Sequence, residues 1–194
     1  MAKTRLESFS DGVLAIIITI MVLELKVPHG GDLSNLRALW PAFLSHLLSF
    51  VYLGIYWNNH HHMLQTCRQV QGSILWANTH LLFWLSLVPF ATRWLGENHF
   101  AAAPSALYGF VLLMSAIAYR ILQALIIAAQ GKHSLLGRAV RGDWKGRVSS
   151  VLYFIAVPVA FLWTWVSLAI YVVAALLWLV PDRRIERLVL DADT

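Results

Sequence analysis

Long apolar stretches constrain this chain more than any other feature of its sequence. Four stretches reach the ~20 residues that an α-helix needs to cross a bilayer, and they run from about 8 to 27, 39 to 64, 73 to 93 and 104 to 129. The composition agrees, because 59% of the 194 residues are hydrophobic, 13% are charged, and the mean hydropathy is +0.64. A soluble domain of this size is less apolar. The sequence therefore predicts an all-α integral membrane protein.

A fifth apolar region, from residue 148 to 180, is too long for one span. A helix over its whole length would measure ~50 Å, against a hydrocarbon core of ~30 Å. Two short spans fit better, with a turn predicted around 163–167, where two tryptophans suit a membrane interface. The expectation is six transmembrane helices in a single domain over residues 1–194.

The basic residues predict which ends of these helices face the cytoplasm. With six spans and both termini inside, eleven Lys and Arg residues fall on inner segments and three fall on outer loops. The inner set is Lys3, Arg5, Arg68, Lys132, Arg138, Arg141, Lys145, Arg147, Arg183, Arg184 and Arg187, and the outer set is Lys26, Arg37 and Arg93. Positive charge stays on the cytoplasmic side, so the net charge of +5 indicates topology and not nucleic-acid binding. The tail 182–190 is expected either to lie on the inner surface as an amphipathic helix or to remain a solvated end.

The first helix is predicted to have two different faces. At ~100° per residue, one stripe carries Ile16, Thr19, Ile20 and Leu23, with Arg5, Phe9 and Gly12 on the same bearing. Ser10 and Asp11 point to other sides of the helix. The stripe by itself also suits lipid contact or ordinary packing.

The carboxyl group of Asp11 needs a partner, because an intramembrane carboxylate is costly when it is unpaired. The expected donors lie on the second and third helices: Asn58, His60, His61, His62, Asn78, His80 and Trp84. The alternative is that Ser10 and Asp11 only cap a helix that begins one turn later.

The segment from Arg5 to Asp11 resembles the Arg-x-x-x-Phe-Ser-Asp signature of the lysosomal potassium channel family, transmembrane protein 175. The similarity continues through 12–16 and 23–28, and looser matches are Trp57 with His60 and Asn78 with Pro89. This chain has one six-helix repeat, as prokaryotic members do. The resemblance implies a multi-pass protein of the prokaryotic plasma membrane with both termini in the cytoplasm, assembled as a homotetramer in the lipid bilayer.

The resemblance also implies roles for particular residues. Helix 1 of each subunit would line a central pore, with the constriction at Ile16, further narrow points at Ile20 and Leu23, and a contribution of Thr19 to selectivity. The signature segment would tie this helix to helices 2 and 3 of its own subunit. The expected anchoring set is Arg5, Phe9, Ser10, Asp11, Trp57, His60 and Asn78.

A ring of four isoleucines would form an apolar neck that closes by dewetting. The sequence contains no Thr-Val-Gly-Tyr-Gly filter, so selectivity is expected to come from partial dehydration and to favour potassium only weakly to moderately over other monovalent cations. At the outer end, Glu24 is expected either to concentrate cations or to pair with Lys26.

Other functions remain as alternatives. His46 and His60 lie 14 residues apart, hence ~40° apart on a helix, which resembles the haem ligands of b-type cytochromes, but a second pair is missing. A proton-coupled transporter with Asp11 as relay is another alternative, although broken helices and inverted repeats are not evident. We expect no enzyme activity, no cofactor and no metal, and the single Cys67 excludes an internal disulfide.

Overall fold

The computed structural model describes residues 3–29, 31–131, 134–140 and 143–179, and all regular structure in these ranges is helical. The elements are α1 (Lys3–Leu23), the 3₁₀ helix η1 (Leu33–Leu39), α2 (Trp40–Gln65), α3 (Gly72–Ser86), α4 (Val88–Glu97), α5 (Ala102–Gln130), α6 (Leu135–Ala139), α7 (Trp144–Val159) and α8 (Thr164–Leu179).

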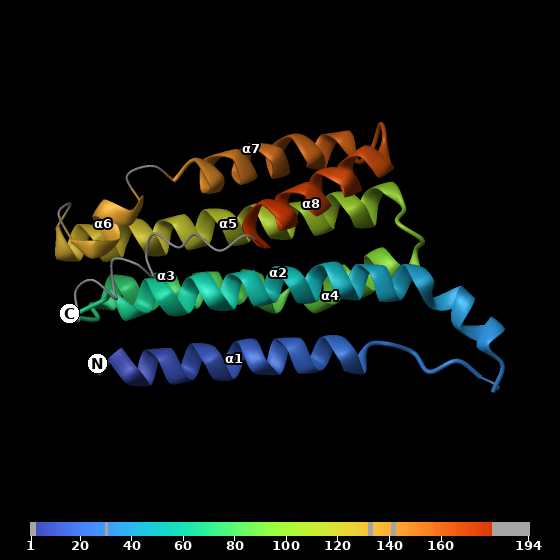
Figure 1. The fold of residues 1–194 in the computed structure, drawn as a ribbon, viewed down its shortest axis with the longest axis horizontal. Helices are drawn as coiled ribbons and strands as arrows, with labels where there is room; N and C mark the ends of the chain where they lie inside the picture. Colours follow the sequence, from blue (N-terminus) through green and yellow to red (C-terminus); the bar gives the residue numbers. More distant parts are fainter. Residues whose placement is uncertain (1–2, 30, 132–133, 141–142, 180–194) are drawn as a thin grey trace.

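The long helices run along one common direction and alternate in sense, so the chain crosses the bundle repeatedly (Figure 1). α1 lies at one side of the bundle and packs on α2, α3 and α4, whereas α5 packs on α3, α4 and α7. A single core of buried apolar side chains extends from α1, at Leu14, to α8, at Tyr171. The described helices therefore form one unit.

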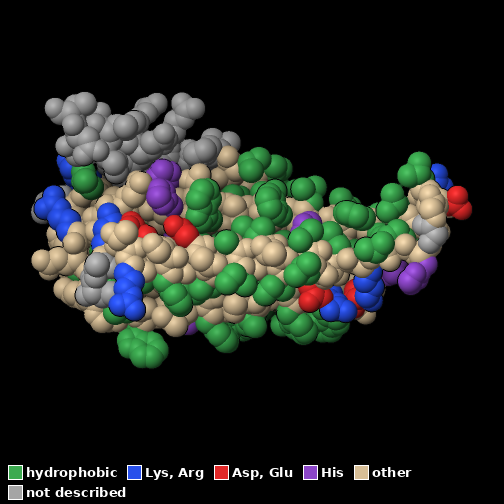
Figure 2. All heavy atoms as spheres, turned by 90° about the horizontal axis from the view of Figure 1, so that it is seen from below, with side chains coloured by type: hydrophobic (Ala, Val, Ile, Leu, Met, Phe, Trp, Pro, Cys, Tyr) green, Lys and Arg blue, Asp and Glu red, His purple; other side chains and the backbone are tan. Residues whose placement is uncertain are grey.

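Four helical segments are long and apolar enough to span a membrane: Lys3–Leu23, Leu33–Gln65, Gly72–Glu97 and Ala102–Gln130. α7 and α8 have 16 residues each and would be ~24 Å long. On the face occupied by α1, hydrophobic side chains spread along the bundle, while Lys and Arg gather toward the two ends (Figure 2). This is the distribution of a multi-pass membrane protein. The predicted tail helix at 182–190 lies outside the described residues.

The third predicted span is interrupted and continues further than expected. The helix is interrupted at Leu87, whose N–H donates a 3.2 Å hydrogen bond to Trp84 O and so forms a tight turn. Pro89 follows in the first turn of α4, where a missing N–H does no harm. The helix then continues to Glu97, four residues beyond the predicted end.

The turn between the last two helices lies earlier than the predicted 163–167. α7 ends at Val159 and α8 begins at Thr164. The hydroxyl of Ser167 donates a 2.9 Å hydrogen bond to Ala156 O and so fastens the first turn of α8 to α7. The prediction was wrong because the tryptophans indicate depth in the membrane and not the residue at which the chain turns.

Candidate functional site

The two predicted faces of α1 differ in burial. One face is buried against the other helices and consists of Leu6, Ser10, Leu14, Ile17 and Met21, spaced three or four residues apart. The other carries Phe9, Ile16, Ile20 and Leu23, of which Ile16 is 60% and Leu23 76% exposed. An apolar stripe on α1 is thus left exposed by the residues that the structure describes.

Thr19 is the polar member of this exposed stripe. Its hydroxyl donates a 2.8 Å hydrogen bond to Ala15 O, one turn earlier in the same helix. The hydroxyl proton is therefore used within α1, while the oxygen keeps acceptor capacity on the exposed side.

On the buried face, a chain of hydrogen bonds joins α1 to α3 and α2. The amide of Asn78 donates to Ser10 Oγ at 2.9 Å, and Ser10 Oγ donates to Leu6 O at 2.9 Å. Asn78 Oδ1 lies 2.7 Å from His60 Nε2. An amide oxygen only accepts, so Nε2 of His60 carries the proton. Ser10, His60 and Asn78 are all buried, and every link of the chain is satisfied.

Asp11 has a different partner from those expected. Its Oδ1 accepts a 3.1 Å hydrogen bond from the indole Nε1 of Trp57 on α2. The indole ring stacks on His61 with 6.2 Å between ring centres. The expected donors His60 and Asn78 bond to each other instead. Trp57 was placed in the anchoring set by resemblance, but its contact with Asp11 was not predicted.

The alternative in which Ser10 and Asp11 cap a later helix is wrong. α1 begins at Lys3, so both residues lie inside it. The Lys3 ammonium donates to Gln65 O at 2.8 Å, which ties the start of α1 to the end of α2. Arg5 and Phe9 are exposed, and among the described residues the structure does not bring them into the hydrogen-bonded set.

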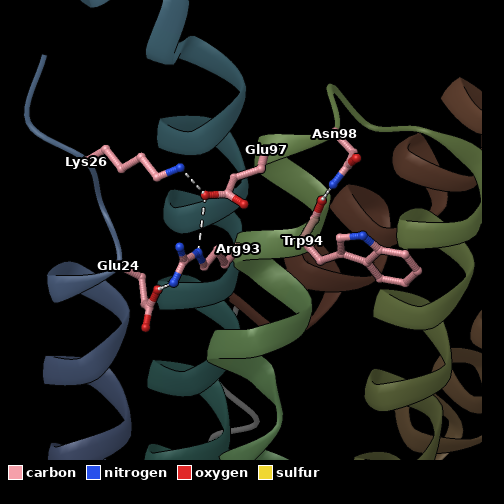
Figure 3. Close-up of polar contacts among 6 residues, drawn as sticks. All are labelled: Glu24, Lys26, Arg93, Trp94, Glu97 and Asn98. Atoms are coloured by element: carbon pink, nitrogen blue, oxygen red, sulfur yellow. Dashed lines mark hydrogen bonds and ion pairs between the residues drawn. The ribbon is translucent and has the colours of Figure 1, made fainter.

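At the opposite end of α1, four charged side chains form what we call the outer charge cluster (Figure 3). Arg93 on α4 donates to Glu24 through Nη1 and to Glu97 Oε1 through Nε, the latter at 3.2 Å. Lys26 Nζ lies 2.7 Å from the same Glu97 oxygen. Of the two alternatives for Glu24, the pairing with Lys26 is therefore wrong: Glu24 bonds to Arg93 and Lys26 to Glu97.

The histidines are the residues on which the haem and metal alternatives depend. Within the described ranges, no group of three or more His, Cys, Asp or Glu side chains converges on a possible metal position. His60 already uses Nε2 on Asn78. It would have to break this buried hydrogen bond to bind haem through that nitrogen.

Comparison with known proteins identifies the family of this chain. The sequence profile of the family described as endosomal/lysosomal potassium channel TMEM175 matches residues 5–89, the part that contains α1 and the helices fastened to it. A protein of Chryseobacterium sp. (strain P1-3) named as a potassium channel is 54% identical over 187 residues, which cover 96% of this chain and 97% of the relative. The chain belongs to the TMEM175 family. A second relative, named as a potassium channel of Chamaesiphon minutus, is 32% identical over 89% of this chain and 91% of its own length.

A solved TMEM175 structure also resembles the fold of the whole chain. The crystal structure of a lysosomal potassium-selective channel TMEM175 homolog from Chamaesiphon minutus superposes with a TM-score of 0.81 at 29% identity, and covers 93% of this chain and 97% of that one. The similarity therefore extends over the TMEM175 fold beyond the matched segment 5–89.

Proposed function

We propose that this chain is the subunit of a homotetrameric, potassium-preferring cation channel. Residues 1–194 would form one channel domain with six membrane crossings: α1, α2, α3 with α4, α5, α7 and α8. Both termini would face the cytoplasm of a prokaryotic cell, because most basic residues then lie on the inner side. The exposed stripe of α1 would line the pore on the symmetry axis.

The observation that supports this proposal is that the two faces of α1 make different contacts. Polar hydrogen bonds fasten its buried face to α2 and α3 of the same chain, through Ser10 and Asp11. From Phe9 to Leu23, the exposed face is apolar apart from Thr19. Between helices in lipid the hydrophobic effect supplies little attraction, so polar contacts of this kind fix which way a helix faces. A helix fixed in this manner presents a constant surface to neighbouring subunits.

Ile16 would form the main constriction, with Ile20 and Leu23 one and two turns further out. Four apolar side chains around an axis exclude water unless the neck widens, and ions cannot cross a dry neck. Potassium would be preferred because it is larger and more weakly hydrated than sodium, and so loses less on partial dehydration. The outward oxygen of Thr19 would replace part of the lost hydration.

The test is potassium conductance of the purified protein in planar bilayers. Ile16→Asn makes the neck polar, and a barrier lowered by roughly 1.4 kcal/mol would raise the current about tenfold. Ile155→Asn is the matched control, since Ile155 is exposed on α7 and far from α1 in the fold. We expect parental current from the control. Unchanged current for Ile16→Asn would remove this residue from the pore.

Further measurements distinguish the proposal from its alternatives. Saturable uptake that strictly requires a proton gradient would indicate a transporter, whereas a channel gives currents that follow the potassium gradient. A Soret band in the purified protein would indicate a cytochrome. Light scattering of the detergent-solubilised protein should give four chains per particle, and a monomer would contradict the pore.

A further inference from the structure

The outer end of α1 is attached to its own chain differently from the inner end. Met21 is the last buried residue of the helix, and Val22 and Leu23 are exposed. Behind this end lies a pocket of about 420 Å³ between α1, α2 and α4, lined among others by Met21, Ala42 and Thr92. Apolar packing of α1 against α2 and α4 is therefore incomplete at the level of Leu23.

The outer charge cluster bridges this interruption. Glu24 and Arg93 both line the pocket, and their ion pair connects the end of α1 directly to α4. The same guanidinium bonds to Glu97 one turn along α4 at 3.2 Å, so the fork of Arg93 is fixed by two carboxylates from different helices (Figure 3). Lys26 adds a second link from the segment after α1 to Glu97.

α4 offers a rigid support for this contact. A Cβ atom added to Gly96 would come within 2.6 Å of Ser45 Oγ and 2.8 Å of Ala42 Cα on α2. Only glycine permits the two helix backbones to lie this close. At the end of α4, the Asn98 side chain donates to Trp94 O at 2.9 Å and satisfies one of the terminal carbonyls. Arg93 therefore projects from a helix that is itself closely packed on α2.

We propose that Arg93 positions the outer end of the pore helix and, by binding Glu24, limits how far Leu23 extends toward the pore axis. The inference rests on the proposed function. Glu24 follows Leu23 by one residue, about 100° around the helix, so a pull on Glu24 toward α4 turns Leu23 away from its three symmetry copies. Without that pull, four exposed leucines would associate at the aqueous pore mouth to reduce their contact with water, and the outer mouth would narrow.

Loss of the Arg93–Glu24 ion pair should shift the equilibrium between open and closed channel moderately for each subunit and more strongly for the tetramer. The side chains of Arg93 and Glu24 are 44% and 34% exposed, and the loss of such a pair changes an equilibrium by about a factor of two. If the four subunits open together, the factors multiply to about sixteen. Arg93→Ala should therefore lower the equilibrium constant for opening by about sixteenfold, and the open probability by up to that factor. Arg93→Lys, which keeps the charge but loses the fork, should lower it less.

The decisive measurement is single-channel recording of Arg93→Ala with and without Leu23→Ser. Leu23→Ser removes the apolar side chain that would close the mouth, so the double variant should recover the parental open probability. Arg37→Ala is the control for a lost outer positive charge, because Arg37 lies exposed on η1 outside the outer charge cluster. It should behave as the parent. The amount of tetramer is measured for every variant, which separates gating from assembly.

Two results would overturn the proposal. One is an Arg93→Ala channel whose open probability equals that of the parent. The other is a loss of open probability that Leu23→Ser does not restore, since Arg93 would then have only a structural role. If the proposed function itself is wrong, the parental protein will carry no potassium current, and this outcome is distinct from the two results above.

Discussion

The hydrogen-bonded chain through Asn78 allows a quantitative prediction. Asn78→Leu keeps the number and branching of the side-chain heavy atoms, so the variant leaves no large cavity. It removes the hydrogen bond to Ser10 and the one from His60. Hydrogen bonds between transmembrane helices contribute about 0.6–1.7 kcal/mol each. The gain from a buried leucine is small, since lipid is equally apolar.

The two partners of Asn78 are affected unequally. Ser10 still donates to Leu6 O, so its hydroxyl stays satisfied. The Nε2 proton of His60 is left without an acceptor in a buried position, which costs about 1–3 kcal/mol. This penalty already includes the loss of the hydrogen bond from His60, so only the bond to Ser10 is added to it. We expect Asn78→Leu to destabilise the protein by about 2–5 kcal/mol.

The assay is thermal unfolding of the purified protein in detergent, followed by tryptophan fluorescence. A loss of this size should lower Tm by roughly 4–20 °C for a chain of this length. Thr79→Leu is the matched control, because Thr79 is exposed on the same helix and its hydroxyl bonds only to Leu75 O. It should leave Tm nearly unchanged. Equal Tm values for the two variants would refute the reasoning.

Two further substitutions test other contacts. Gly109→Ala should lower Tm by more than the control Thr79→Leu, because the new Cβ would lie 1.9 Å from the Tyr171 hydroxyl. Overpacking of this kind costs about 1–3 kcal/mol. An unchanged Tm would show that α8 can shift away from α5. Trp57→Phe removes the indole N–H that donates to Asp11 at 3.1 Å, together with one ring of the side chain, and should cost about 1 kcal/mol in the same assay. Trp76→Phe makes the same change of ring at an exposed site of α3 and should cost nothing measurable. Equal values would show that the Trp57 contact does not stabilise the fold.

Several parts of the fold follow from the sequence because they depend on local properties. The length and apolar character of each run predict a membrane-spanning helix without knowledge of its neighbours. The separation of Ser10 from Ile16 on α1 follows from the helical repeat, which is why the buried and exposed faces of α1 could be told apart in advance. The bounds were less accurate, since the sequence has no clear cap at Lys3 and the break at Leu87 depends on the proline two residues later.

The partners of the charged and polar groups could not be predicted in the same way. Glu24 has Lys26 two residues away, yet it bonds to Arg93, which is 69 residues away in the sequence. Asp11 similarly selects Trp57 from many donors on two helices. Each choice depends on which helices are neighbours and how far each is rotated and shifted along its axis. A shift of one residue moves a side chain by about 100° and 1.5 Å and would change the partner.

The amino-acid sequence by itself determined that the chain crosses a membrane and that α1 has an apolar stripe at Ile16, Ile20 and Leu23, because hydropathy and helical periodicity are properties of consecutive residues. The tertiary structure alone decided that this stripe is left exposed and that Asn78 joins Ser10 to His60. It also decided that Arg93 reaches Glu24 across a pocket. These contacts are made between helices, and only packing of the whole bundle sets the distances across which their side chains meet.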